Sequence, residues 1–105
     1  MLYDKKWEQK PEVEPESWRS VLLNAATYIR GHGWCQGSLQ DPSGRVCLWG
    51  AIALATKCQD TPANSLAKTK IIEWIGGSIV KWNDDPNQTE RNVINTLEAV
   101  ARKGE

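Results

Sequence analysis

The chain has 105 residues, of which 40% are hydrophobic and 25% charged, and its 13 basic residues are balanced by 13 acidic ones. This length suits one domain with a single core, and the composition is too apolar for a disordered chain. A net charge of zero supplies no overall field that would concentrate nucleic acid around the protein, so nucleic acid is not expected as a partner.

No apolar run reaches the roughly 20 residues that cross a bilayer, and the charged first ten residues are unlike a signal peptide. We therefore expect a cytoplasmic protein without a membrane partner. Three cysteines cannot all pair with one another, and a reducing compartment opposes disulfides, so free thiols are expected.

Residues 1–14 show no helical period and are predicted to form an N-terminal arm, with 15–105 as a single helical domain. A first helix is predicted from Pro15, which suits a first helical turn. It should end at Gly31–Gly33, because glycine readily adopts the positive φ that stops a helix. Its apolar positions recur at helical spacing: Trp18, Val21, Leu22, Ala25, Tyr28 and Ile29.

The segment after the first helix is predicted to be a short hairpin or ordered loop. Residues 41–44 read Asp-Pro-Ser-Gly, which fits a type I turn. A second helix, apolar and rich in small residues, should follow from about Val46 to Ala55.

A third helix is predicted from about Ala63 to Ile75, after a polar breaker that ends in Pro62. Its inward side chains should be Leu66, Ile71, Ile72 and Ile75. The apolar segment 78–82 fits either one helical turn or a strand-like element, and its period does not separate the two. A last helix should start at a Thr89 cap and end near Arg102. The expected fold is all-α: a compact domain of four main helices.

Three motif segments occur in order along the chain: Gly33-Trp34-Cys35-Gln36-Gly37, then Asp41-x-x-Gly44-x-x-Cys47-Leu48-x-Gly50-Ala51, and later Trp82-Asn83-Asp84-x-Pro86. This pattern resembles a family of small uncharacterised proteins of bacteria, notably actinobacteria, and of phages. The resemblance extends from Pro15 to Arg102. It implies a shared fold and a site near the motifs, and it transfers no catalytic residues.

The motif segments combine tryptophans with short polar side chains, a combination that can either fix a turn or border a pocket. In the first interpretation the tryptophans fill the core and the polar side chains satisfy loop backbone groups. In the second the loops form a groove for a ligand or partner. The candidate binding residues are Trp34, Gln36, Asp41, Trp82, Asn83 and Asp84.

A thiol or carboxylate hydrolase is the alternative. Cys47 lies near a predicted helix start, where the helix dipole would lower its pKa, and His32 is the single imidazole of the chain. Asp84 could assist them. Adjacent acids such as Asp84 and Asp85 are more often turn and cap residues.

A metal site and a nucleotide site are both disfavoured. His32, Cys35, Cys47 and Cys58 are suitable ligand types, but eleven residues on one helix would separate the last two cysteines by about 16 Å. Neither Gly31-His32-Gly33 nor Gly76-Gly77 fits a phosphate-binding motif of nucleotide sites. We therefore expect no metal and no cofactor.

The function predicted from the sequence is a non-enzymatic binding module that contacts a protein or small ligand through residues 34–40 and 82–87. In a phage or mobile element it would serve as an inhibitor or accessory factor acting on a host protein. Apolar residues of the arm, Leu2, Tyr3 and Trp7, together with spare tryptophans also make a homodimer an open alternative.

Overall fold

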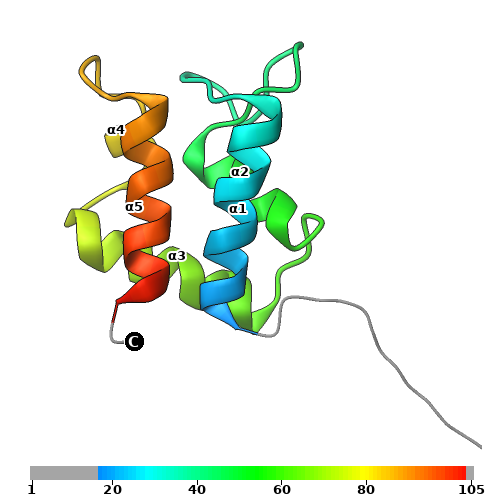
Figure 1. Ribbon diagram of the computed structural model, residues 1–105, viewed down its shortest axis with the longest axis vertical. Helices are drawn as coiled ribbons and strands as arrows, with labels where there is room; N and C mark the ends of the chain where they lie inside the picture. Colours follow the sequence, from blue (N-terminus) through cyan, green and yellow to red (C-terminus); the bar gives the residue numbers. More distant parts are fainter. Residues whose placement is uncertain (1–16, 104–105) are drawn as a thin grey trace, which may run out of the picture.

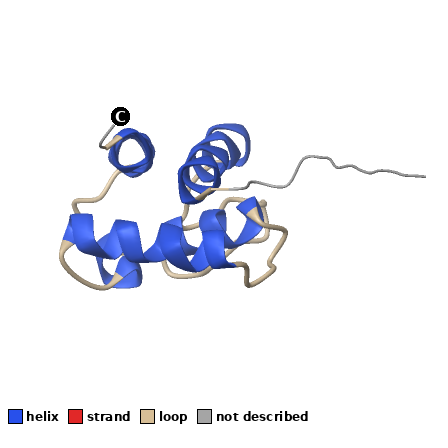
Figure 2. Cartoon of the chain, turned by 90° about the horizontal axis from the view of Figure 1, so that it is seen from below, coloured by secondary structure: helices blue, strands red, loops and turns tan. Residues whose placement is uncertain are grey.

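Five α-helices in two layers make up residues 17–103, the part of the chain that the computed structural model describes. They are α1 (Trp18–His32), α2 (Leu48–Ala55), α3 (Pro62–Ile75), α4 (Ile79–Asn83) and α5 (Glu90–Arg102). Helices α1 and α5 stand side by side, and the remaining helices lie against them as a second layer (Figures 1 and 2). The predicted all-α fold is confirmed.

The number of helices differs from the expected four because α4 is a helix of its own. Its five residues cover most of the segment that the sequence left open between a helical turn and a strand. The hydroxyl of Ser78 accepts a hydrogen bond from the backbone N of Lys81 at 3.3 Å and so caps its first turn. The other four helices are the four that the sequence predicts.

A side-chain cap fixes the start of every helix in the described residues. The capping residues, in chain order, are Ser17, Cys47, Thr61, Ser78 and Thr89. The Thr89 cap is the predicted one. The predicted start of α1 at Pro15 is wrong, because Ser17 is extended and its side chain accepts from the backbone N of Ser20. Pro15 and the proposed arm lie outside the described residues.

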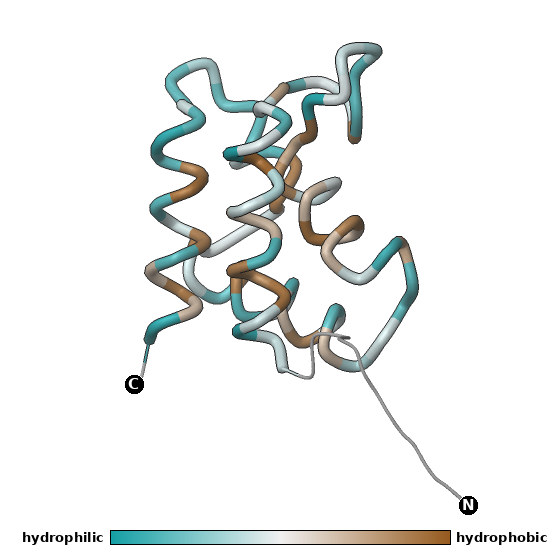
Figure 3. Tube along the Cα trace, turned by 45° about the vertical axis from the view of Figure 1, so that its right-hand side comes forward, coloured by the Kyte–Doolittle hydropathy of each residue, from teal (hydrophilic) through white to brown (hydrophobic). Residues whose placement is uncertain are grey.

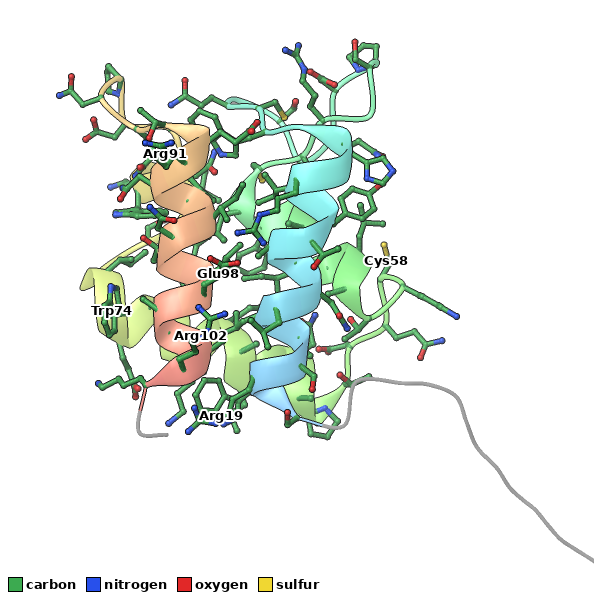
Figure 4. All side chains as sticks on the ribbon, in the orientation of Figure 1. Arg19, Cys58, Trp74, Arg91, Glu98 and Arg102 are labelled. Carbon is green, nitrogen blue, oxygen red and sulfur yellow. The ribbon has the colours of Figure 1, made fainter. Side chains whose placement is uncertain are left out.

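The core lies between the two layers and contains side chains from all five helices. Its largest fully buried apolar members are Leu22, Ile29, Leu48, Ile52, Ile71 and Leu97. Along α5 the apolar segments lie on the side toward α1 (Figure 3). Polar contacts join the same two helices: Arg30 pairs with Glu98, and Arg19 donates to the carbonyl oxygen of Ala101 at 2.8 Å (Figure 4).

Helix α3 contacts its neighbours through a narrower face than predicted. Leu66 and Ile72, expected inside, are 43% and 42% exposed. The buried positions are Asn64, Ala67 and Ile71. Asn64 faces inward because its Nδ2 donates to the carbonyl oxygen of Ile52 near the end of α2, at 2.9 Å. A polar residue therefore occupies part of the face that the apolar pattern assigned to leucine and isoleucine.

The α1–α2 connection is an ordered loop. Two isolated bridges join Val46 to Trp34 and to Gln40, and no longer strand pairing forms among the described residues. Gly33 ends α1 with φ 96°, as the glycine pattern predicts. This loop and the α4–α5 loop lie side by side at one end of the molecule (Figure 1).

Candidate functional site

A single buried side chain, Asn83 at the end of α4, joins the two motif-bearing loops. Its Oδ1 accepts hydrogen bonds from Trp34 Nε1 at 2.7 Å and from the backbone N of Leu48 at 2.9 Å. Its Nδ2 donates to the carbonyl oxygen of Cys35 at 3.2 Å and to Asp84 Oδ1 at 2.9 Å. Asn83 is 1% exposed. Protein groups therefore satisfy all four of its hydrogen-bonding positions.

Gln36 and Asp84 add further links between the loops. Gln36 Nε2 donates to the carbonyl oxygens of Asn83 at 3.0 Å and Asp85 at 2.8 Å. In the opposite direction, the backbone N of Gly37 donates to Asp84 Oδ1 at 3.1 Å. Each motif thus supplies a side chain that pairs with the backbone of the other. We name the surface formed by residues 34–40 and 82–87 the two-loop surface.

A pocket of about 220 Å³ opens at the two-loop surface, and we name it the loop pocket. Its lining residues are Gly37, Ser38, Leu39, Cys47, Val80, Asn83 and Asp84. Leu39 and Val80 are 55% and 49% exposed, whereas Cys47 and Asn83 are buried. The loop pocket therefore combines apolar side chains open to solvent with one carboxylate, that of Asp84.

Gly50 allows the α1–α2 loop to approach α2 closely at the wall of this pocket. A Cβ at Gly50 would lie 2.3 Å from the carbonyl oxygen of Leu39, which is shorter than any tolerated contact. The same oxygen accepts a hydrogen bond from the backbone N of Cys47 at 3.1 Å. Gly50 of the second motif is thus required by close packing rather than by a turn.

Four of the six candidate binding residues form the contacts between the loops or border the pocket: Trp34, Gln36, Asn83 and Asp84. Trp82 is partly buried and packs against the core, and its carbonyl oxygen accepts from Gln88 Nε2 at 3.1 Å. The structure gives these residues contacts of the kind described in the first interpretation: Trp34 and Trp82 are partly buried against the core, and Gln36 pairs with loop backbone groups. It also places a pocket beside them.

Asp41 does not join this group, because its hydrogen bonds are local. Its Oδ1 accepts from the backbone N of Ser43 and of Arg45, and its Oδ2 accepts from Arg45 Nε at 2.6 Å. Desolvation raises the pKa of Asp41, but the hydrogen bonds and charge of Arg45 outweigh it and leave the pKa below 3.8. Asp41 stabilises the predicted turn, which Gly44 closes by donating to its carbonyl oxygen.

The residues of the thiol-hydrolase alternative are only partly brought together. Cys47 and Asp84 both line the loop pocket, and His32 does not. His32 is exposed at the end of α1, where its Nδ1 lies 3.2 Å from the carbonyl oxygen of Tyr28 and its ring stacks on the Tyr28 ring. No imidazole base therefore lines the pocket that holds the thiol.

The lowered pKa of Cys47 that the thiol-hydrolase alternative requires is not found. Cys47 is 5% exposed, and burial raises the pKa of its thiol above the ordinary value of 9.0. Hydrogen bonds from the backbone N of Gly50 and Trp49 oppose this shift but do not reverse it. The Cys47 sulfur accepts from Gly50 N at 3.3 Å and so caps α2. A buried, protonated thiol is a poor nucleophile.

The three cysteines are free thiols in separate environments. Cys35 is buried, and the carbonyl oxygens of Ser38 and Arg45 lie 3.5 and 3.4 Å from its sulfur as acceptors for its single S–H proton. Cys58 is exposed on the turn that follows α2, on the outer side of the molecule (Figure 4). Within residues 17–103, no three His, Cys, Asp or Glu side chains are grouped as a metal ion requires.

Sequence reasoning missed Glu90 as a residue that positions the site, and it included Gly50 in the second motif without assigning it a role. Glu90 Oε1 accepts from the backbone N of Trp34 at 3.1 Å, which ties the first turn of α5 to the α1–α2 loop. An acid beside the Thr89 cap signals a helix start, and nothing in the pattern signals its distant partner. A glycine inside an apolar helix was a signal for close approach that could have been read.

Comparison with protein families matches residues 13–103 to a family of unknown function, DUF6197. Comparisons with curated proteins and with solved structures gave no match. Among the helices described, none has the length and apolar character needed to cross a bilayer. The family match covers most of the 105 residues and confirms the resemblance to a family without an assigned activity. The chain belongs to DUF6197.

Proposed function

We propose that the protein is a non-catalytic binding module whose two-loop surface holds one side chain of a protein partner in the loop pocket. The observation that carries this proposal is the pocket of about 220 Å³ with Leu39 and Val80 exposed at it. Sites for small molecules span about 300 to 1,000 Å³, so this pocket suits a single side chain better than a whole metabolite.

The hydrogen bonds around the pocket support binding rather than catalysis. Gln36 and Asn83 direct their amide groups to other protein groups and leave no free donor for a substrate. Such a network holds the pocket walls in place before a partner arrives, which lowers the entropy lost on binding. The buried thiol of Cys47 has no imidazole base in the pocket, and burial raises its pKa, so the hydrolase alternative gains no support from the geometry.

The proposal extends to the setting expected from the sequence. A small cytoplasmic module with one side-chain pocket would suit an accessory or inhibitor protein of a phage or mobile element, acting on a host protein. A homodimer would be the special case in which the partner is a second copy.

The test is selection of a displayed random peptide library on the full-length protein. Enriched peptides are then measured by isothermal titration against two variants, Leu39→Asp at the pocket and Leu66→Asp on α3. Both positions are exposed leucines, so both variants should fold. We expect binding to wild type and Leu66→Asp, and loss of binding to Leu39→Asp. Equal binding to all three proteins, or no enriched peptide, would contradict the proposal.

A further inference from the structure

The loop pocket contains one charged group, the carboxylate of Asp84, and that carboxylate is only half used by the protein. Its Oδ1 accepts from Gly37 N and Asn83 Nδ2. Its Oδ2 has no hydrogen-bond donor from the described part of the chain, and the ion pairs found there do not include Asp84. Asp84 is exposed to solvent, so the loop pocket has a solvated negative charge beside the apolar side chains of Leu39 and Val80, and no cation of residues 17–103 is paired with it.

The field of Asp84 extends into the pocket. Burial is the largest cause of the raised pKa of Cys47, and the charge of Asp84 contributes to it. Both residues line the pocket, so a thiol on its wall experiences the negative potential of the carboxylate. A cationic group entering the same space would experience an attraction of the same origin.

Two kinds of occupant can be compared on these grounds. A purely apolar side chain would cover the apolar walls but would remove water from Asp84 without replacing its hydrogen bonds, which is unfavourable. A side chain with an aliphatic stem and a cationic end, such as lysine or arginine, would cover the apolar walls with its stem and pair with the Asp84 carboxylate through its charge. The apolar walls and the carboxylate together favour the second kind.

The number of Asp84 oxygen atoms that remain free favours lysine over arginine as the occupant of the pocket. Arginine binds carboxylates best through two parallel hydrogen bonds, which need both oxygens. Asp84 Oδ1 already accepts two donors, which leaves Oδ2 for a single contact. A lysine ammonium acts as a compact point charge and needs only one oxygen.

We propose that the loop pocket binds a lysine side chain of the protein partner, with the aliphatic stem against Leu39 and Val80 and the ammonium on Asp84. The proposal rests on the proposed function and names the chemistry of the partner. A protein is the source rather than a free amine, because Leu39 and Val80 keep about half of their surface exposed and need a larger partner to cover them.

The experiment titrates the full-length, ¹⁵N-labelled protein with blocked amino acids and follows the amide signals of Gly37, Leu39 and Val80. The probes are N-acetyl-lysine methylamide, its norleucine analogue, which has an uncharged aliphatic side chain, and its arginine analogue. Spermidine serves as a free amine. We expect millimolar binding, with lysine about three- to tenfold tighter than norleucine, as for a partly exposed ion pair.

Two variants complete the design. Asp84→Asn keeps an oxygen for Gly37 and removes the charge, so the preference for lysine over norleucine should disappear. Asp60→Asn removes an exposed negative charge between α2 and α3, outside the two-loop surface and outside the lining of the loop pocket, and should keep the preference. The comparison of probes on wild type needs no variant, so a misfolded Asp84→Asn protein would not prevent a decision.

Each remaining outcome overturns a stated part of the proposal. Norleucine binding as tightly as lysine would overturn the lysine assignment and leave the proposed function standing. Tighter binding of arginine would overturn the choice of lysine, and binding of spermidine without blocked lysine would overturn the protein source. No shift of the pocket amides with any probe would overturn the lysine proposal and the proposed function together.

Discussion

The four hydrogen-bond partners of residue 83 require an asparagine at this position. Asn83 accepts from Trp34 Nε1 and Leu48 N through one atom, and donates to Cys35 O and Asp84 Oδ1 through the other. Aspartate would lose both donors and face two oxygens, and leucine would leave Trp34 Nε1, Leu48 N and Cys35 O without this partner. An amide is the side chain of this size that offers two acceptor and two donor positions.

Replacing Asn83 with alanine should destabilise the protein strongly. The indole N–H of Trp34, the backbone N of Leu48 and the carbonyl of Cys35 would lose a partner in a buried site. We expect the free energy of unfolding to fall by about 3 kcal/mol or more, measured by urea denaturation. Asn87→Ala, at an exposed position in the following loop, should change it by less than about 0.5 kcal/mol.

Gly50→Ala should also destabilise, although alanine favours helices over glycine by about 1 kcal/mol. The new Cβ would lie 2.3 Å from the carbonyl oxygen of Leu39 and force the loop away. We expect a loss of about 2 kcal/mol in denaturant unfolding. Gly31→Ala in α1 meets nothing within 4 Å and should stabilise the protein by up to about 1 kcal/mol. A Gly50→Ala protein as stable as wild type, or more stable, would contradict the close approach.

The buried thiol of Cys47 gives stability a pH dependence of definite sign. Its folded pKa is raised above 9.0, so the unfolded chain loses the thiol proton first as the pH rises. This contribution to stability is complete below the unfolded pKa and is lost between that value and the folded one. Cys47→Ser keeps a capping oxygen without a titration in this range. Its unfolding free energy should decline less than that of wild type between about pH 8 and 10.

At the scale of elements, the Thr89 cap and the positions of four helices were predicted from the sequence, and contacts between distant loops were not. The Thr89 cap, the glycine end of α1 and the type I turn at 41–44 depend on neighbours a few residues away. The hydrogen bond from Gln36 to Asn83 depends on how α4 packs against the rest of the fold. The local sequence pattern around either residue does not predict that packing. The loops of the site were therefore predicted, and their mutual attachment was not.

Helix α3 shows where the apolar pattern misleads. Leu, Ile and Trp occur around most of its circumference, so the pattern assigns Leu66 and Ile72 to the core. Burial of Asn64 rotates the contact face toward Ala67 and Ile71 instead. Hydrogen bonds from Asn64 Nδ2 to Ile52 O and Thr56 Oγ1 make that polar position a stable part of the interior.

Neighbouring isoleucines on α3 provide a matched test of this orientation. Ile71 is fully buried and Ile72 is 42% exposed. Ile71→Ala should lower the free energy of unfolding by about 2 to 5 kcal/mol, and Ile72→Ala by less than about 1 kcal/mol. Chemical denaturation of the two variants measures both. Equal losses would mean that α3 is rotated from the orientation described.

At the scale of the molecule, α1 makes the most extensive helix contacts, with α5 and α2 above all and also with α3. The core and the two-loop surface share this helix, since α1 runs directly into the loop that carries Trp34. We therefore expect one unfolding transition for the helices and the loops. Far-UV circular dichroism and tryptophan fluorescence should give coincident curves in urea. Separate midpoints would show that the loops open independently.

The hydrogen bonds of Asn83 also determine the order of events during folding. They join positions 35, 48 and 49 residues apart along the chain. Closing such long loops is entropically costly, and contacts of this separation form late. The two-loop surface is therefore completed after the helices have docked, and its loss should mainly accelerate unfolding. If a partner binds at the two-loop surface as proposed, it should recognise only fully folded molecules, and its binding should lengthen the lifetime of the native state.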